Sequence, residues 1–378
     1  MVRVGFPTSY PNVKTVLQLR RVGAHGQAPT TVFRRMTTER SAEYVLQTVS
    51  KRKIRFIRLW FTDVQGFLKS VAISPAELET ALDEGMTFDG SSIDGYARVQ
   101  ESDMVAKPDP GTFQIIPWRD EPDVARMFCN ILRPDGTPFG GDPRHVLRRN
   151  LEAAAGEGYS FYVGPEIEFF YFQDAGPDPV VLDRGGYFDL TPLDVAQEYR
   201  RTTIMHLEQL GIPVEYSHHE VAPSQHEIIL RYENALAMAD SIMTFRLAVK
   251  EVALANDVHA TFMPKPLTNH DGSGMHLHPS PLDEDGNAFA APDDETGLSP
   301  DGRSLVAALL HHAPALTAIT HQWVNSYKRL VRGFEAPIYT TWARNNESAL
   351  VRVPTTKAGK RESTRLEFRS PDSGANPY

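Results

Sequence analysis

The sequence predicts an α+β protein of two domains, and three observations support this prediction. Segments with helical spacing of apolar residues alternate with short β-rich segments along the chain. The 378 residues are 41% hydrophobic and 23% charged, which is an ordinary globular balance. A turn-dense connector, RPDGTPFGGDP (133–143), marks the boundary between a smaller unit (36–138) and a larger one (139–378).

The smaller unit contains two predicted helices and two predicted strands. The stretch TERSAEYVLQTVSKRK (38–53) has helical spacing, whereas IRFIRLWF (54–61) and FLKSVAI (67–73) are rich in β-forming residues. A second helix is predicted between Ser74, a favourable N-cap residue, and Gly85. These elements predict a compact α+β unit.

The larger unit contains longer elements of both kinds. The predicted strands are YSFYVGPEIEFFYF (159–172), VEYSHHEVA (214–222) and HEIILRY (226–232). The predicted helices cover residues 144–156, 191–211 and 233–257. The acidic, Pro- and Gly-rich stretch at 281–302 is expected to be a surface loop.

The composition argues against two classes of partner. The net charge is -9, and an acidic body does not suit binding to a nucleic-acid backbone. No run of about 18 apolar residues is present, so the sequence predicts no membrane association. The single cysteine, Cys129, excludes an internal disulfide and is typical of a reducing compartment such as the cytoplasm.

Residues 1–35 are expected to be a flexible basic extension. They contain six Lys and Arg residues, no acidic residue and no clear periodicity. Two alternatives are an upstream start before the true start at Met36 and a transit peptide of similar composition.

Carboxylates and imidazoles fall into four short clusters. Residues i and i+2 of a strand face the same way, so each of three pairs is predicted to project together. The pairs are Glu166 with Glu168, His276 with His278, and Glu367 with Arg369. Glu220 and Glu227 flank the turn VAPSQH, which folds them toward one neighbourhood.

Neighbouring carboxylates are destabilising unless a cation neutralises them. A hydrated strand edge is the alternative reading for any one pair, but four clusters in one chain favour a metal site. Carboxylates with one imidazole suit Mg²⁺ or Mn²⁺ better than Zn²⁺ or copper.

The common nucleotide-binding motifs are absent from the sequence, which has neither a Walker A loop nor G-x-G-x-x-G after a strand. An ATP site would therefore be built from metal ions and arginines, which balance the charge of a transferring phosphoryl group. Arginines do gather toward the end of the chain, at Arg329, Arg332, Arg344, Arg352, Arg365 and Arg369.

Six motifs, in this order, resemble type I glutamine synthetase. They are FDGSS (88–92), PEIEFF (165–170), HHEVAPSQHE (218–227), GSGMHLH (272–278), VNSYKRLVRGFEAP (324–337) and RLEFRSPDSGANPY (365–378). The similarity runs from about residue 40 to the last residue. Six ordered motifs make it highly specific, whereas any one alone would be weak.

The resemblance implies an N-terminal β-grasp domain followed by a glutamine-synthetase catalytic domain, whose curved antiparallel sheet is flanked by helices. It implies a homo-oligomer, a dodecamer of face-to-face rings, in which subunits share each active site. Members of the family continue beyond SGANPY, so the chain is expected to be truncated at its C-terminus.

The resemblance also implies ATP as co-substrate and two ions of Mg²⁺ or Mn²⁺ per site. One ion would be held by Glu168, Glu220 and Glu227 and would position the γ-carboxylate of glutamate. The other would bridge the phosphates of ATP, and its ligands would be Glu166, His276 and Glu367.

Roles for the remaining site residues come from the same resemblance. Asp89, supplied by a neighbouring subunit, would bind ammonium and take its proton, and Glu335 would lie on a flap that excludes water. The glutamate-binding residues would be Gly272, Arg329 and Arg369. The ATP-binding residues would be Tyr232, His278, Ser280, Arg352 and Arg365, with Arg352 also acting in catalysis.

Three departures from the family pattern bear on specificity. Asn346 and Glu347, with one extra residue, stand where the family has an arginine. Asp271 replaces an asparagine that touches substrate glutamate, and Arg332 replaces a proline beside the flap.

The leading hypothesis is ATP-dependent ligation of ammonia to glutamate. The alternatives are a γ-glutamyl ligase for a polyamine or another amine, and a non-catalytic relative. Asp89 favours the small cation ammonium, whereas the altered substrate positions favour a larger amine. The complete set of metal ligands argues against a non-catalytic protein.

Overall fold

The computed structural model describes residues 41–378, except 94, 97–102, 120–122, 358 and 361–362. The predicted extension, residues 1–35, lies outside the described residues. Although two described helices have 21 residues each, none in this part of the chain is apolar enough over a sufficient length to cross a bilayer.

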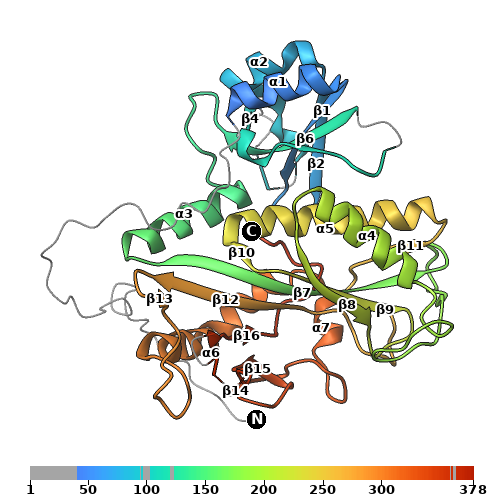
Figure 1. The fold of residues 1–378 in the computed structure, drawn as a ribbon, viewed down its shortest axis with the longest axis vertical. Coiled ribbons are helices and arrows are strands. Elements are labelled where there is room, and N and C mark those ends of the chain that lie inside the picture. The colour runs from blue at the N-terminus through green and yellow to red at the C-terminus, as the bar shows by residue number, and fades with distance from the viewer. Residues whose placement is uncertain (1–40, 94, 97–102, 120–122, 358, 361–362) are drawn as a thin grey trace, which may run out of the picture. The chain divides into compact units, whose positions relative to one another are not determined.

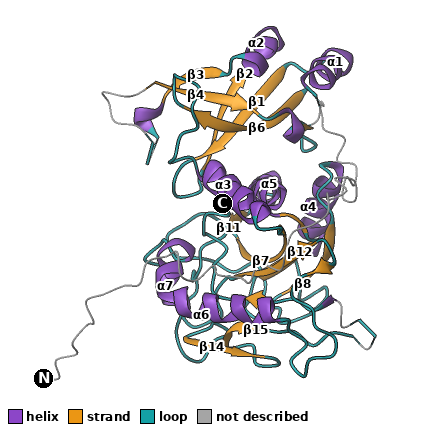
Figure 2. Cartoon of the chain, turned by 90° about the vertical axis from the view of Figure 1, so that its left-hand side faces the viewer, coloured by secondary structure: helices purple, strands orange, loops and turns teal. Residues whose placement is uncertain are grey.

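The N-terminal domain is a six-stranded mixed sheet with its helices on one face (Figures 1 and 2). The strand order is β2-β1-β6-β4-β3, with β5 beside β6 and a parallel pairing of β1 with β6. The strands are β1 (Phe56–Thr62), β2 (Leu68–Ile73), β3 (Met86–Asp89), β4 (Asp103–Pro108), β5 (Gln114–Ile115) and β6 (Val124–Leu132). The helices are α1 (Ala42–Arg52) and α2 (Leu78–Asp83).

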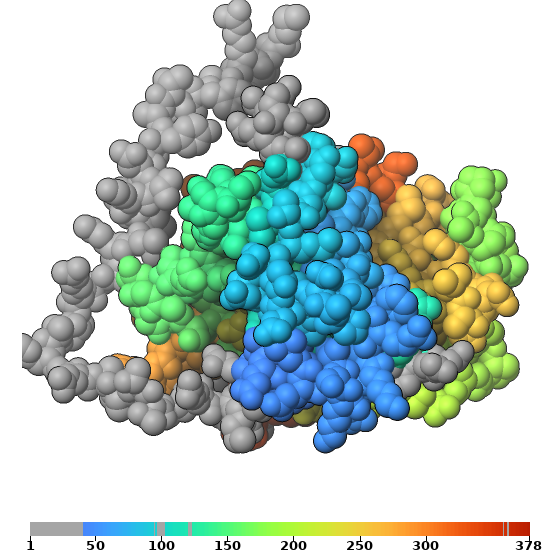
Figure 3. All heavy atoms as spheres, turned by 90° about the horizontal axis from the view of Figure 1, so that it is seen from above, coloured from blue at the N-terminus to red at the C-terminus, as the bar shows by residue number. Residues whose placement is uncertain are grey.

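Helix α1 forms where the apolar spacing predicted it. The Ser41 hydroxyl accepts a hydrogen bond from the Tyr44 backbone N–H at 3.2 Å, which caps the first turn. Val45 and Val49 are buried on one side of the helix and pack into the core of this domain. Seen from above in Figure 3, the surface of this domain is coloured blue to blue-green.

The larger domain, which the resemblance implies is the catalytic domain, is built on a ten-stranded sheet with the order β14-β15-β16-β12-β7-β9-β8, and β10, β11 and β13 at its sides. All pairings are antiparallel except that of β14 with β15. The central strands are β7 (Ser160–Phe172), β8 (Val214–His219), β9 (Gln225–Leu230) and β12 (Met275–Asp283). The others are β10 (Glu233–Asn234), β11 (His259–Thr261), β13 (Gly286–Asn287), β14 (Tyr339–Ala343), β15 (Ala349–Arg352) and β16 (Glu367–Phe368).

Helices cover this sheet on both sides (Figure 1). Helix α4 packs on α5 and β8, and α5 packs on β7, whereas α6 contacts β14 and β15. The helices are α3 (Pro143–Gly156), α4 (Gln197–Gln209), α5 (Ala235–Ala255), α6 (Pro300–Thr320) and α7 (Ser326–Arg329). The core between β7 and α5 is apolar, with Ile167, Phe169 and Phe245 fully buried.

The expectation of a surface loop at residues 281–302 is wrong in part. The end of β12, the short strand β13 and the start of α6 lie within this stretch. Phe289 and Leu298 are 2% and 1% exposed and pack in a core cluster with Leu366 and Val351. The prediction failed because acidic and turn-forming residues dominate the composition of this stretch, whereas only a few apolar residues pack in the core.

A buried arginine joins the N-terminal domain to the catalytic domain. The Arg144 guanidinium contacts Asp240 of α5 at 2.9 Å and Asp109 at 2.8 Å, and it also donates to Asn130 of β6 at 2.6 Å. The Tyr378 hydroxyl donates to the same Asp240 carboxylate at 2.7 Å. The Arg144 side chain is only 4% exposed, so its positive charge depends on these partners.

We expect Arg144→Met to destabilise the protein strongly, because it leaves two carboxylates without their buried cation. Loss of one partner from a buried ion pair costs roughly 3–5 kcal/mol. The control is Arg201→Met, which breaks the exposed ion pair with Glu198 and should cost less than about 1 kcal/mol. Chemical denaturation measures both, and equal losses would contradict the role given to Arg144.

Candidate active site

The strand register of the catalytic sheet lines up the predicted ligands across several strands. Glu166 of β7 lies opposite His276 of β12, and Glu168 lies opposite Glu227 of β9. Glu227 in turn lies opposite His218 of β8. Directly opposed side chains on one face are close neighbours, so antiparallel pairing gathers residues that are far apart in sequence.

Glu166, His276 and Glu367 form one cluster, as predicted. Their possible ligand atoms lie within 4.8 Å of one another. The His276 Nδ1 atom is 3.3 Å from Glu166 Oε2 and 3.8 Å from Glu367 Oε1. His278 lies beside them, with its Nε2 atom 2.8 Å from Glu166 Oε1.

The second predicted triad, Glu168, Glu220 and Glu227, is divided between two groups that share Glu227. Glu168 and Glu227 form a group with His276, and Glu220 and Glu227 form a group with His218, each within 4.8 Å. Glu168 is oriented by Gln225 Nε2 at 3.0 Å and by the Gly274 N–H at 2.9 Å.

Burial and neighbouring carboxylates outweigh the nearby positive charge at two glutamates of the second cluster. Burial, together with Glu168 and Glu227, raises the pKa of Glu220 to about 9. Burial, together with Glu168 and Glu166, raises the pKa of Glu227 well above its usual value. The Nε2 atom of buried His276 has no hydrogen-bond partner. Oxygen-rich donors with one free imidazole nitrogen and an excess of negative charge fit Mg²⁺ or Mn²⁺.

The negative charge of the first cluster is better balanced, because positively charged side chains lie beside it. Burial opposes ionisation of Glu166, but hydrogen bonds from His276 and His278 lower its pKa below the usual value. The Glu367 carboxylate accepts from Arg352 Nη1 at 2.8 Å and also from Arg369 Nη1. Arg352 and Arg369 therefore lie beside one carboxylate, and their phosphate-binding and glutamate-binding roles stay predictions.

Two predicted glutamate-binding residues, Arg329 and Gly272, lie next to each other, and Gln225 Nε2 links the Gly272 carbonyl to Glu168. Arg329 is 2% exposed, and its guanidinium donates to the carbonyls of Ser370 at 2.9 Å and Arg369 at 3.3 Å. A Cβ on Gly272 would lie 2.2 Å from the Pro264 carbonyl oxygen, so no larger residue fits there. The substrate roles of Arg329 and Gly272 stay predictions.

Four of the five predicted ATP-binding residues gather near the N-terminal half of β7, whereas the fifth, Arg352, lies beside Glu367. Ser280 and His278 of β12 lie opposite Tyr162 and Gly164. Tyr232 is 62% exposed and forms an edge contact with Tyr162, with 6.2 Å between the ring centroids. Arg365 donates to His278 Nδ1 at 3.3 Å, which links this group to the first carboxylate cluster.

Glu335, the predicted flap residue, is held by Asp271, one of the departures from the family pattern. The Asp271 carboxylate accepts from the Glu335 backbone N–H at 2.9 Å. Lys265 lies 3.4 Å from the centroid of the Phe334 ring, which anchors the same segment. Burial, together with Asp271 and Glu347, raises the pKa of Glu335.

The predicted ammonium-binding residue, Asp89, lies in the N-terminal sheet and not in the catalytic sheet (Figure 2). Its carboxylate accepts from the Ser91 backbone N–H at 2.8 Å and from the Ser91 hydroxyl at 2.6 Å. These hydrogen bonds lower the pKa of Asp89, so it is a carboxylate at neutral pH.

Sequence reasoning missed His218. Its Nε2 atom is 2.9 Å from Glu227 Oε2, and its Nδ1 atom is 3.4 Å from Glu220 Oε1. The signal was available, because His218 and Glu220 have the same i, i+2 spacing that singled out the other pairs.

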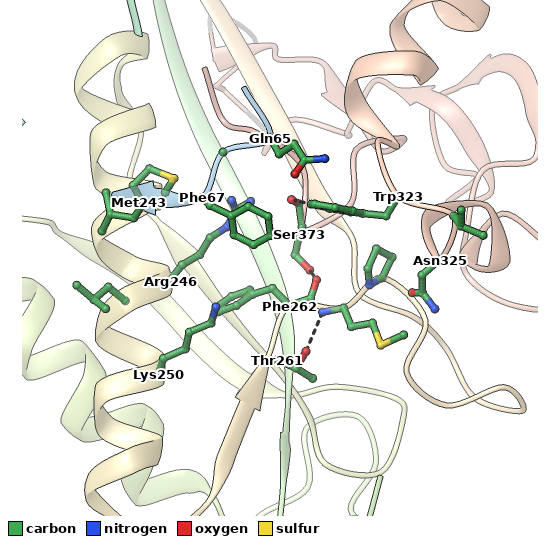
Figure 4. A pocket seen from close by; sticks show the side chains of 17 residues that line it. Gln65, Phe67, Met243, Arg246, Lys250, Thr261, Phe262, Trp323, Asn325 and Ser373 are labelled. Carbon is green, nitrogen blue, oxygen red and sulfur yellow. Dashed lines mark hydrogen bonds between the residues drawn. The ribbon is translucent and has the colours of Figure 1, made fainter. Parts of the chain in front are cut away.

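A cavity of about 730 Å³ is lined by other residues, among them Phe67, Arg246, Lys250 and Trp323. Figure 4 shows Arg246 and Lys250 projecting from α5 toward it, with Trp323 on the opposite side. Its lining includes no predicted site residue, so we assign it no part in the chemistry of the carboxylate clusters.

Comparison with known proteins identifies two matching regions. Residues 53–134 match the family described as "Glutamine synthetase, beta-Grasp domain", and residues 140–378 match "Glutamine synthetase, catalytic domain". The curated glutamine synthetase of Mycolicibacterium smegmatis is 56% identical over 346 residues, covering 90% of this chain and 78% of that protein. That of Thermotoga maritima is 48% identical over 340 residues, covering 89% and 77%.

Solved structures agree with the sequence matches. Plasmodium falciparum glutamine synthetase superimposes with a TM-score of 0.83 at 27% identity, covering 89% of this chain and 72% of that one. The fold is thus a β-grasp domain followed by a glutamine-synthetase catalytic domain, as the sequence predicted. This chain belongs to the glutamine synthetase family.

Proposed function

We propose that this chain joins ammonia to the γ-carboxylate of L-glutamate at the expense of ATP, through γ-glutamyl phosphate. The observation that carries the proposal is the convergence of five glutamates and His276 on one face of the catalytic sheet. In a chain of this family, such a cluster suits a reaction that brings two anions, glutamate and ATP, together.

We assign two divalent cations, Mg²⁺ or Mn²⁺, to the two clusters. Glu168, Glu220 and Glu227 would hold one ion. The ligands of the other would be Glu166, His276 and Glu367. When bound, the ions would supply the positive charge that the excess of buried carboxylates lacks and would lower the repulsion between glutamate and ATP.

The first step in this proposal is transfer of the γ-phosphoryl group. A γ-carboxylate oxygen of glutamate attacks the γ-phosphorus, the bond to the bridging oxygen of ADP breaks, and γ-glutamyl phosphate forms. Arg352, with 26% of its side chain exposed, would turn toward the phosphates and stabilise the transferring group. Arg329, Arg369 and the Gly272 carbonyl would hold the glutamate.

The second step is attack of ammonia on the acyl carbon, which expels inorganic phosphate. Asp89 of a neighbouring subunit would bind ammonium and accept its proton, since the amine attacks in its neutral form. The flap at Glu335 would keep water from hydrolysing the acyl phosphate. Tyr232 would pack on the adenine, with His278, Ser280 and Arg365 also contacting ATP.

This proposal includes a homo-oligomer, a dodecamer, in the cytoplasm. The position of Asp89 in a separate sheet supports a site completed by a second copy of the chain. Cys129 is buried and free, as in proteins of a reducing compartment. A larger amine is the alternative acceptor, and the curated relatives named glutamine synthetase in Mycolicibacterium smegmatis, Thermotoga maritima and Halobacterium salinarum do not favour it.

The direct test measures phosphate release from ATP with glutamate and each candidate amine. We expect ammonium to stimulate release and to give glutamine, with no stimulation when glutamate is omitted. Putrescine and spermidine serve as the comparison, and stimulation only by these polyamines would replace the ammonia proposal with the alternative.

Glu227→Gln should separate metal binding from folding. This substitution should raise the melting temperature of the metal-free protein at neutral pH, because Gln needs neither to bind a proton nor to carry a charge beside Glu168 and Glu166. Turnover should fall by more than the roughly 100-fold that loss of an outer-shell partner typically costs. Glu198→Gln, at a glutamate 67% exposed, should change neither quantity. Retained turnover in Glu227→Gln would exclude it as a ligand.

A mixing experiment tests whether subunits share the site. Asp89→Asn and Glu227→Gln should each be nearly inactive alone. When both are expressed together in equal amounts, about a quarter of the sites would combine an intact Asp89 with an intact Glu227, because the shared contact is heterologous. Activity in the mixture that never exceeds that of the separate variants would place both residues in one subunit's site.

A further inference from the structure

A buried polar cluster lies behind the turn that joins β8 to β9. The turn carries Glu220 at one end and Glu227 beyond the other, and Ser224 within it adopts a positive φ of 61°. A left-handed conformation is costly for a residue with a side chain, so surrounding contacts must hold Ser224 in place. Asp183, from the connection between β7 and α4, supplies them.

Asp183 and Ser224 bind one another through both backbone and side chain. Asp183 Oδ1 accepts from the Ser224 N–H at 2.9 Å. In return, the Ser224 hydroxyl oxygen accepts from the backbone N–H groups of Leu182 at 2.7 Å and Asp183 at 3.0 Å. The Tyr171 N–H of β7 donates to the Ser224 carbonyl at 3.0 Å, which fastens the turn to the central strand.

His219 connects this cluster to the backbone of a predicted ligand. The Nε2 atom of His219 lies 3.0 Å from Asp183 Oδ1, and its Nδ1 atom lies 2.6 Å from the Glu220 carbonyl oxygen. The ring is completely buried. A Cβ on Gly185 would lie only 2.7 Å from His219 Nε2, so the connection after Asp183 fits closely against this ring.

The same connection also orients His218. The Phe188 N–H donates to the His219 carbonyl at 3.1 Å. The rings of Tyr187 and Phe188 stack on each other and meet the His218 ring edge-on, with centroids 5.2 and 4.7 Å away. Asp183 therefore begins a segment that packs against both histidines preceding Glu220.

Asp183, His219 and His226 have a spacing that could hold a metal ion, but their contacts argue against one. The Arg200 guanidinium lies 2.7 Å from His226 Nδ1 and pairs with Asp194 at 2.6 Å, so a cation already occupies this position. Both ring nitrogens of His219 already have oxygen partners, and Asp183 accepts from several N–H groups.

We propose that Asp183, acting through Ser224 and His219, is a positioning residue that fixes Glu220 relative to Glu227. It thereby sets the affinity of the metal site assigned to Glu168, Glu220 and Glu227, and leaves the other site unchanged. This inference rests on the proposed function, because it assumes that these glutamates bind a metal ion.

The test is a Mn²⁺ titration of the metal-free protein, in which electron paramagnetic resonance reports free Mn²⁺. Two backgrounds isolate the sites: Glu367→Gln leaves the site that contains Glu220, and Glu220→Gln leaves the site that contains Glu367. Asp183→Asn should weaken Mn²⁺ binding roughly 10–100-fold in the Glu367→Gln background, as expected for an outer-shell partner. In the Glu220→Gln background it should change nothing.

The matched control is Asp174→Asn, in the same connection. Its carboxylate accepts from the Gly176 N–H in an exposed turn, and this substitution should leave both sites unchanged. Equal weakening in the two backgrounds would indicate a general structural role and overturn the proposal, as would no weakening in either. If the wild-type chain binds no Mn²⁺, the proposed function itself fails.

If Asp183→Asn does not fold, Ser224→Ala tests the same positioning role. It removes the hydroxyl that holds Leu182 and Asp183 but keeps the N–H that donates to Asp183. We expect the same selective weakening of the site that contains Glu220, to a smaller extent. Unchanged Mn²⁺ binding in a folded Ser224→Ala protein would overturn the positioning role.

Discussion

The register of β7 against its two neighbours is the constraint on which the site depends. Glu168 opposes Glu227 on one side, and Glu166 opposes His276 on the other. A slip of one residue would turn Ile167 toward the charged face and a glutamate into the apolar core, because side chains alternate along a strand. The buried row Ile167, Phe169 and Tyr171 on the opposite face therefore fixes the register that the chemistry needs.

This arrangement places the stabilising and destabilising interactions on opposite faces of one strand. The apolar face packs against α5 and contributes to folding, whereas the glutamates on the other face repel one another when no cation is bound. Ionising this face therefore costs folding free energy, and a ligand that brings positive charge lowers that cost. Arg352, Arg369 and His278 offset the charge of one cluster, whereas burial and neighbouring carboxylates raise the pKa values of Glu220 and Glu227, so this cost is largest at these two glutamates.

Local sequence rules predicted the strands β1, β2, β7, β8 and β9 and the same-face pairs, since both depend on near neighbours. They could not predict which strands pair, because the register of β7 with β12 joins residues about 110 positions apart. Local rules could not predict the Asp183 cluster either, because Asp183 contacts His219 and Ser224 through the fold of the long connection between β7 and α4. His218 differs, because the i, i+2 rule would have found it beside Glu220.

The three departures from the family pattern act at the rim of the site and leave its metal-binding face intact. Asp271 accepts the Glu335 N–H through a side-chain oxygen, and the asparagine of the family pattern has an equivalent oxygen. The replacement of asparagine by Asp271 therefore keeps this hydrogen bond and adds a negative charge. Glu347 lies 3.6 Å from Arg352, but it is 54% exposed, and exposed ion pairs contribute at most about 1 kcal/mol. A nucleotide phosphate, with its higher charge, would displace Glu347 from Arg352 at small cost. In the proposed function, Asp271 and Glu347 would therefore change the surroundings of Glu335 and Arg352 and leave the carboxylates of β7, β9 and β16 in place.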